Sequence, residues 1–286
     1  QSLQNHTAAI ASIVLSPDGK YLFSGALDDT IIQWDISTAN PVRRFVGHRD
    51  GVLDIILSKD GQQLFSAGRD RSVLQWDVVT GEVRRNFTEH TRWIHRLVLS
   101  PDETQVFSGD DDNVIIQWTI STGARLRTLR GHTDSIVSLA VAADGKSVFS
   151  GSLDYTVRQW DISNGTLLRT IPAHTGAVRG LAVTANNQYL YSGSNDTTIK
   201  QWEIATGRLV NTLTGLSHSM NEMALSPSEK YLYSGGEDKL VKQWDLSSGT
   251  LVRDIPGSGR PIHAVAVSPD GTQLFAGGLD RVITQW

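Results

Sequence analysis

The sequence predicts an all-β fold built from seven repeated units, and two observations support this prediction. The dipeptide Gln-Trp recurs every 42 residues, seven times in one register, and the seventh pair ends the chain. Each interval also holds four short runs rich in β-branched, aromatic and other apolar residues, and turn residues separate these runs. A fixed period of this length is the signature of a repeat architecture.

The second repeat shows how four strands follow one another within one period. Its runs VLDIIL, QLFSA, SVLQW and EVRRNF each have the length of a strand. The turn signals between them are KDG at 59–61, RDR at 69–71 and TG at 80–81. Helical periodicity is absent, so each repeat predicts one four-stranded antiparallel sheet.

A sheet of this kind cannot bury two apolar faces alone, whereas seven sheets packed radially bury both faces of each sheet. The predicted fold class is therefore an all-β, seven-bladed β-propeller of four-stranded antiparallel blades, which occupies residues 1–286 as a single domain. Seven full periods exceed the 286 residues by eight, and residues 1–5 align with the outermost strand of the other repeats. We therefore expect the N-terminal strand to complete the last blade and close the ring. Because the chain does not begin with Met, we also expect it to be part of a longer protein.

Composition argues against several classes of function. The chain contains no Cys, its formal net charge is −4, and no apolar run approaches the ~20 residues that span a bilayer. Disulfides and thiolate chemistry are therefore excluded, and the bulk charge does not favour nucleic acid or an anionic membrane. No metal-binding motif is present. The acidic run GDDDN at 109–113 contains Asp112, and every repeat has an Asp at this position, six residues before its Trp. We expect no metal, no cofactor, no nucleic acid and no membrane contact, and a monomeric, cytoplasmic protein.

Three further columns accompany the repeated Trp. A Ser stands ten residues before the Trp in six repeats, an Asp six residues before it in all seven, and a His 28 residues before it in five. On these columns the whole chain resembles the WD-repeat family of β-propellers, through the His of GH, the Asp of the turn before the third strand and the Trp of QWD.

In that family the Trp, the Ser, the His and the Asp form a hydrogen-bonded structural tetrad, and the resemblance implies five complete tetrads here. They are His6, Ser24, Asp28 and Trp34; His48, Ser66, Asp70 and Trp76; His90, Ser108, Asp112 and Trp118; His132, Ser150, Asp154 and Trp160; and His174, Ser192, Asp196 and Trp202. The sixth repeat has Leu216 in place of the His, and the seventh has Ser258 and Ala276 in place of the His and the Ser. Ser, His and Asp also occur in hydrolase triads, but a nucleophile needs access and an oxyanion hole. We therefore expect structural tetrads, no catalytic residue and no enzyme activity.

Two other columns lie outside the tetrad. The residue before the Trp is Gln in all seven repeats, where the family commonly has an apolar residue. Either the Gln side chains form hydrogen bonds between blades, or they reflect the amplification or design of one repeat unit. An Arg recurs five residues before the His position in five repeats. We interpret its charge as a guard against edge pairing between molecules, with a phosphate-binding or membrane-binding stripe as the alternative.

The resemblance implies that a partner binds at the face around the central channel. In the family, side chains three and five residues after the His position, and directly before the tetrad Asp, contact partners there. The candidates for partner contact among them are Arg69, Trp93, His95, Asp111, Arg179, Glu237 and His263. Trp93 is the only one of the eight Trp residues outside the 42-residue column, and the other repeats carry a small or compact residue at its position.

We therefore predict a non-enzymatic scaffold that binds a protein or a peptide at the channel mouth, with Trp93 as the anchor over the second and third blades. Two alternatives remain open. Trp93 can fold over the channel rim and pack locally, and the chain can be a structural, amplified or designed repeat propeller with no selected partner.

Overall fold

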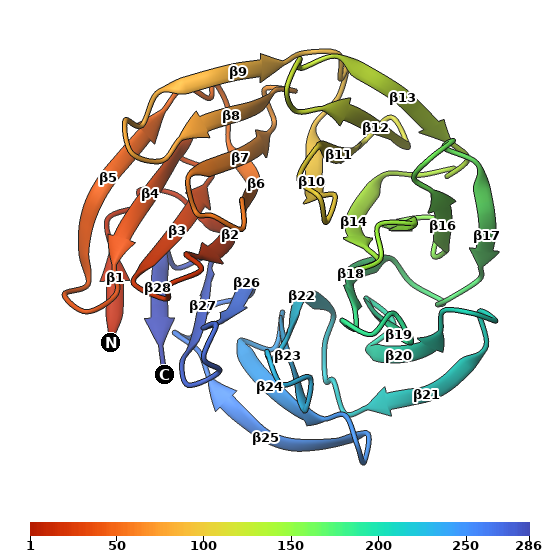
Figure 1. The fold of residues 1–286 in the computed structure, drawn as a ribbon. Coiled ribbons are helices and arrows are strands. Elements are labelled where there is room, and N and C mark those ends of the chain that lie inside the picture. Colours follow the sequence, from red (N-terminus) through yellow and green to blue (C-terminus); the bar gives the residue numbers. More distant parts are fainter.

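The computed structural model describes residues 1–286 and shows seven four-stranded antiparallel sheets arranged in a ring (Figure 1). Six sheets each contain four consecutive strands, and the seventh contains the last three strands of the chain and the first. The predicted seven-bladed β-propeller is therefore confirmed. We number the blades one to seven by the order of their innermost strands, so that blade seven also contains the first strand of the chain.

Each blade presents one strand to the centre of the ring and one to the outside. The innermost strands are β2 (Ile10–Leu15), β6 (Val52–Leu57), β10 (Ile94–Leu99), β14 (Ile136–Val141), β18 (Val178–Val183), β22 (Met220–Leu225) and β26 (Ile262–Val267). The second strands are β3 (Tyr21–Ala26), β7 (Gln63–Gly68), β11 (Gln105–Asp110), β15 (Ser147–Ser152), β19 (Tyr189–Ser194), β23 (Tyr231–Gly236) and β27 (Leu274–Gly278). The third strands are β4 (Thr30–Asp35), β8 (Val73–Asp77), β12 (Val114–Thr119), β16 (Val157–Asp161), β20 (Thr198–Glu203), β24 (Leu240–Asp245) and β28 (Val282–Gln285). The outermost strands are β5 (Asn40–Val46), β9 (Val83–Phe87), β13 (Arg125–Arg130), β17 (Leu167–Ile171), β21 (Leu209–Thr214), β25 (Thr250–Pro256) and β1 (Ser2–Gln4). The structure contains no helix that is long and apolar enough to cross a membrane.

The ring closes between the two ends of the chain. Strand β1 pairs antiparallel with β28, with Leu3 opposite Ile283. Leu3 is 1% exposed and belongs to one buried cluster with Ile10 and Trp34 of blade one. The N-terminal strand therefore completes blade seven, as the length of the chain predicted, and covers the edge that β28 would otherwise present.

The hydrophobic core lies between neighbouring blades. The ring of Phe45 on β5 meets Trp76 on β8 edge-on, with 5.8 Å between the ring centroids. Phe87 and Trp118 repeat this arrangement at 5.5 Å between blades two and three. Aromatic pairs of this geometry contribute about 0.5–1.5 kcal/mol beyond the burial of their area. The repeated Trp therefore holds its blade against the preceding one.

The outer Arg column joins neighbouring blades. Arg43 donates to the carbonyl of Thr80 at 2.7 Å, and Arg169 donates to the carbonyls of Ile204 and Ala205 at 3.0 and 3.1 Å. These acceptors lie in the turn that precedes the outermost strand of the next blade. The guanidinium groups of Arg43 and Arg169 therefore also join neighbouring blades, whereas Arg253 donates to Gln243 of its own blade at 2.7 Å. The interpretation of this column as a guard against edge pairing between molecules stays a prediction.

In blade three, the Gln before the repeated Trp also forms a hydrogen bond to a backbone carbonyl of the next blade. Gln117 donates to the carbonyl of Ile162 in blade four at 3.0 Å and accepts a hydrogen bond from Arg127 at 3.3 Å. Gln117 also donates to Gln105 of its own blade at 2.6 Å, and in blade two Gln75 donates only in the equivalent bond, to Gln63 at 2.6 Å. Gln117 therefore forms the hydrogen bond between blades that was one of the two interpretations of this column.

Candidate functional site

Two loop positions in every blade build one face of the ring, which we call the channel-mouth face. The backbone N–H of the residue before the tetrad Asp position donates to the carbonyl of the residue three positions after the His, and all seven blades repeat this bond. The donor–acceptor pairs are Leu27–Ala9, Arg69–Gly51, Asp111–Trp93, Leu153–Ser135, Asn195–Ala177, Glu237–Ser219 and Leu279–Pro261, at 2.9–3.2 Å. The two loops of each blade are therefore fixed to one another, and their side chains border the same face.

A β-bulge in every innermost strand aims one further side chain at the centre of this face. The register between the first and second strands of each blade skips one residue. The skipped residues are Ala11, Leu53, His95, Val137, Arg179, Asn221 and His263. With Arg96 and Glu237 they line a cavity of 290 Å³, which is the mouth of the central channel. Bulges re-aim side chains and are over-represented beside functional sites.

Arg96 closes the channel beneath this mouth. From β10 its guanidinium forms an ion pair with Glu222 on β22 and lies 3.5 Å from Asp54 on β6. Its Nε also donates to the carbonyl of Val137 at 3.2 Å. Strands β10 and β22 lie on opposite sides of the ring (Figure 1), so the ion pair spans the channel. Arg96 therefore separates the mouth from a second cavity of 250 Å³ that Asp54 and Glu222 also line.

The two carboxylates beneath the mouth are largely removed from solvent. Burial raises the pKa of Asp54 and the pKa of Glu222, although the charge of Arg96 opposes this effect at both groups. Asp54 also accepts hydrogen bonds from the hydroxyl of Ser12 and the backbone N–H of Leu97, both at 2.8 Å. The three charged side chains therefore form one buried network that ties blades two, three and six together.

Sequence reasoning did not identify this network, although a signal for it was present. Asp54, Arg96 and Glu222 occupy a single column, six residues after the His position. The other members of the column are small, namely Ser12, Ser138, Gly180 and Ala264. Charged residues in an otherwise small column on the innermost strand mark a place where side chains meet across the channel.

The channel mouth holds polar groups both with and without partners. His95 lies 2.6 Å from Asp111, so this predicted pair meets at the rim. Arg179 forms no ion pair, its Nε has no hydrogen-bond partner, and Nε2 of His263 also lacks one. Burial lowers the pKa of Arg179 and the pKa of His263, and the charge of Glu237 partly opposes this effect at both groups.

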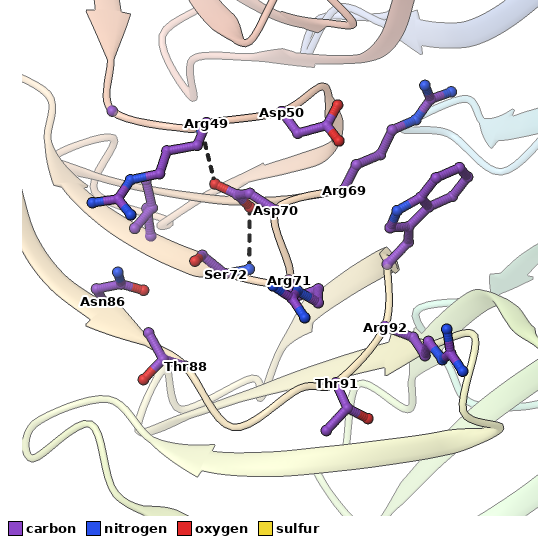
Figure 2. Close-up of a pocket in the computed structure, with 13 residues that line it drawn as sticks. Arg49, Asp50, Arg69, Asp70, Arg71, Ser72, Asn86, Thr88, Thr91 and Arg92 are labelled. Carbon is purple, nitrogen blue, oxygen red and sulfur yellow. Dashed lines mark hydrogen bonds between the residues drawn. The ribbon is translucent and has the colours of Figure 1, made fainter.

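A groove between blades two and three opens on the same face. It has a volume of 640 Å³, and four Arg and two Asp are among the residues that line it. The lining residues are Gly47, Arg49, Asp50, Arg69, Asp70, Arg71, Ser72, Leu74, Asn86, Thr88, Thr91, Arg92 and Trp93. The guanidinium carbon of Arg69 lies 4.7 Å from the centroid of the Trp93 ring. Trp93 is 44% exposed, so local packing against Arg69 leaves nearly half of its surface free. Figure 2 shows the loops of blade two and the chain entering blade three around this groove.

The predicted partner-binding residues thus divide between two hollows. Arg69 and Trp93 line the groove, and the other members line the channel mouth or hydrogen-bond at its rim. The mouth members are His95, Asp111, Arg179, Glu237 and His263. The columns chosen from the sequence therefore share one face but do not form a single cluster.

The tetrad residues form hydrogen-bonded chains in the interior of the blades. The indole N–H donates to the Ser hydroxyl at 2.7–2.9 Å in blades one to six. Nε2 of the His lies 2.6–2.8 Å from the same hydroxyl in blades one to five. Nδ1 lies 2.6–2.9 Å from an Asp carboxylate in these five blades. An indole can only donate and a carboxylate can only accept, so a neutral His with its proton on Nδ1 satisfies every member.

The comparison with protein families agrees with this geometry. The family model described as "WD domain, G-beta repeat" (WD40) matches residues 1–35, 39–77, 81–119, 123–161, 165–203, 207–245 and 249–286. The chain belongs to the WD40 repeat family. WD40 propellers are typically protein-interaction scaffolds and are generally not enzymes. The resemblance predicted from the repeated columns is therefore confirmed.

Blade three departs from the WD40 pattern, and the prediction that Asp112 pairs with His90 is wrong. The His90 ring contacts Asp110, which lies two residues earlier at the end of β11 and is 1% exposed. Asp112 instead accepts a hydrogen bond from Thr91 and lies 3.5 Å from Arg92 near the surface. The backbone N–H groups of the turn donate to Asp110 as they do to the tetrad Asp of other blades. The more deeply placed of two carboxylates on one turn therefore takes the buried His.

Blade six replaces the missing His with a Lys that sequence reasoning did not identify. Nζ of Lys242 lies 3.5 Å from Asp238 and 2.7 Å from Asp254, and the Lys242 side chain is 4% exposed. Trp244 still donates to Ser234 at 2.9 Å. Blade six therefore keeps the Trp–Ser half of the WD40 tetrad and neutralises its Asp with a buried cation.

Blade seven has no substitute of this kind. Ala276 replaces the Ser and Ser258 replaces the His, so the two residues that join the Trp to the Asp in a complete tetrad are both missing. One carboxylate oxygen of Asp280 is buried without a hydrogen-bond partner. The tetrad is therefore absent from the blade that is instead completed by the N-terminal strand.

Proposed function

We propose that this WD40 propeller binds a protein or peptide partner on the channel-mouth face, over blades two and three, with Trp93 as the anchor. The single observation that carries the proposal is the position of Trp93. Its ring is 44% exposed beside a groove of 640 Å³, while five of the seven Trp residues of the repeated column are among the most deeply buried side chains.

Two physical arguments support Trp93 as a contact residue. An exposed indole leaves apolar area in water, and burying that area against a partner is favourable. The guanidinium of Arg69 stacks on the ring at 4.7 Å and restricts it before any partner arrives. A pre-ordered aromatic side chain loses less entropy on binding, and Trp and Arg are the residues most enriched at interface hot spots.

The proposal is tested by capturing partners from an extract of the source organism on three forms of the propeller. These forms are the wild type, Trp93→Ala and Leu168→Ala. Leu168 is a suitable control because it is 52% exposed on the outermost strand β17, outside the channel-mouth face. A protein that binds the wild type and Leu168→Ala but not Trp93→Ala supports the proposal. If Trp93→Ala retains every specific partner, the proposal is wrong.

The alternative is a structural or amplified repeat propeller without a selected partner, and the identical 42-residue spacing favours it. The same capture experiment distinguishes it, because such a propeller retains no specific protein in any form. A monomeric state and a cytoplasmic location stay predictions, which sedimentation and localisation of the tagged protein can test.

A further inference from the structure

We infer that the groove between blades two and three binds a phosphate monoester, the group carried by a phosphorylated Ser or Thr side chain. The assignment of this phosphate to a partner protein rests on the proposed function, because the partner would carry the phosphorylated side chain. The binding of the group rests only on the residues of the groove.

The first support is that blade two differs from the other blades at loop positions that border the groove. Arg49 follows the tetrad His, where the other blades carry Thr, Ser or Gly. Arg69 precedes the tetrad Asp, where no other blade carries a cation. Arg71 follows the same Asp, where only blades six and seven carry one. Since most blades fold without Arg at these positions, packing does not require the three charges.

The second support is that these cations have no carboxylate partner. Asp70 is occupied by His48 at 2.9 Å and by the backbone N–H of Arg49 at 3.0 Å. Asp50 accepts from the backbone N–H of Gly51 at 2.7 Å. The fourth Arg of the lining, Arg92, is paired with Asp112, so the three unpaired Arg and the two Asp of the lining leave a net charge of +1. A phosphate monoester carries a charge of about −1.5 to −2 at neutral pH, so the groove and the group are complementary.

The third support is a set of neutral donors in the same groove. Ser72, Asn86 and Thr88 line it beside Arg49 (Figure 2), and their side chains form no hydrogen bond within the protein. A phosphate monoester presents three acceptor oxygens and a carboxylate two, and a guanidinium binds phosphate through paired N–H groups. The number of free donors therefore favours phosphate over a carboxylate.

The repeat supplies matched replacements for a test. Arg49→Thr introduces the residue that four other blades carry at this position, and Arg71→Asn introduces the Asn that blade three carries. Residue 71 has φ of 65° and Asn113 has φ of 64°, so Asn suits this backbone. Arg281→Asn is the control, because Arg281 holds the same loop position in blade seven, away from the groove.

The experiment is a titration of each form with N-acetyl-O-phosphoserine amide, followed by calorimetry and by NMR of the backbone amides. We expect saturable binding to the wild type and to Arg281→Asn, with amide shifts at residues 69–74 and 86–93. Because hydrogen bonds to charged groups are lost, we expect the affinity of the Arg49→Thr/Arg71→Asn double variant to fall about tenfold or more. Should the double variant not fold, the Arg49→Thr variant alone carries the same expectation with a smaller loss.

Three outcomes overturn the inference: no saturable binding to the wild type, unchanged binding to the double variant, or equal affinity for N-acetyl-glutamate amide. The result also separates this inference from the proposed function. A groove that binds phosphoserine in a propeller without Trp93-dependent partners supports the inference and contradicts the proposed function. A Trp93-dependent partner that phosphatase treatment leaves bound supports the proposed function and contradicts the inference.

Discussion

Nδ1 of His90 lies 2.6 Å from a carboxylate oxygen of Asp110, and both side chains are buried. Asp110→Ala removes the only carboxylate that the His90 ring contacts and leaves a buried N–H without an acceptor. We expect the free energy of unfolding to fall by about 1–3 kcal/mol. Asp112→Ala removes a carboxylate that is 39% exposed, and we expect a change within about 0.5 kcal/mol. Urea unfolding of the two variants measures the difference, and equal losses would contradict the assignment of Asp110 to the tetrad.

Arg96 neutralises two buried carboxylates, so its removal is expected to be costly. Arg96→Met leaves Asp54 and Glu222 buried without a cation, and breaking a buried pair in this way costs about 3–5 kcal/mol. Replacing all three residues with the small residues of their column, as Asp54→Ser, Arg96→Ser and Glu222→Ala, should restore most of the stability. Thermal unfolding of the single and triple variants tests this. If Arg96→Met unfolds at the same temperature as the wild type, the network does not stabilise the ring.

Acid is expected to destabilise the propeller through its tetrads. Burial raises the pKa of Asp154, but hydrogen bonds from His132 and Thr156 outweigh burial and hold the pKa well below the usual value of 3.8. The unfolded chain therefore binds this proton more readily than the folded protein. The stabilisation is present in full above about pH 4 and is lost as the pH falls below that value. Asp28 adds to the same loss, because its pKa is lowered in the same way.

Asp154→Asn tests this expectation, because an amide cannot titrate in this range. The variant should be less stable than the wild type at neutral pH but should lose less of its remaining stability between about pH 5 and pH 2. Unfolding in urea across this range provides both curves. Parallel curves show that Asp154 does not contribute to acid unfolding.

The N-terminal strand is expected to stabilise the ring out of proportion to its length. A chain that starts at residue 6 keeps His6 but loses β1, so it exposes Ile283, which is fully buried in the intact ring. It also leaves β28 as an open edge that can pair with another molecule. We expect a lower melting temperature and concentration-dependent association in analytical ultracentrifugation. A truncated chain that melts like the parent and stays monomeric contradicts the importance of closure.

The fold was predictable because several independent sequence signals repeat with the same period of 42 residues. Turn residues, strand-length runs and the Trp column recur together, so a single repeat determines the blade and the count of residues determines the closure between β1 and β28. The tetrads followed the same columns in blades one, two, four and five. In blade three the column predicts Asp112, but burial decides between two carboxylates on one turn and favours Asp110.

Contacts between side chains across the ring could not be predicted from the comparison of equivalent positions in the seven repeats. Arg96 and Glu222 are 126 residues apart, and their contact depends on the diameter of the channel and the direction of both side chains. The choice of the channel-mouth face came from the family resemblance. The division of its residues between the groove and the mouth depends on the β-bulge, which turns the residue five positions after the His toward the channel.

Trp93 is expected to contribute to binding and not to folding. Trp93→Ala should weaken the binding of the partner by about 2 kcal/mol or more, as hot-spot Trp residues do, because it removes the exposed ring beside Arg69. The melting temperature should barely change, since all six other blades carry small or compact residues at this position.

Trp118 of the same blade provides the matched contrast. It is 1% exposed, donates to Ser108 at 2.8 Å and packs against Phe87. Trp118→Ala should cost about 3–5 kcal/mol of folding stability through the cavity and the lost hydrogen bond. Calorimetric unfolding and the affinity for the captured partner, measured on both variants, separate the two roles. If Trp93→Ala binds the partner normally, or destabilises the fold as much as Trp118→Ala does, Trp93 is a packing residue of the channel rim and not an anchor.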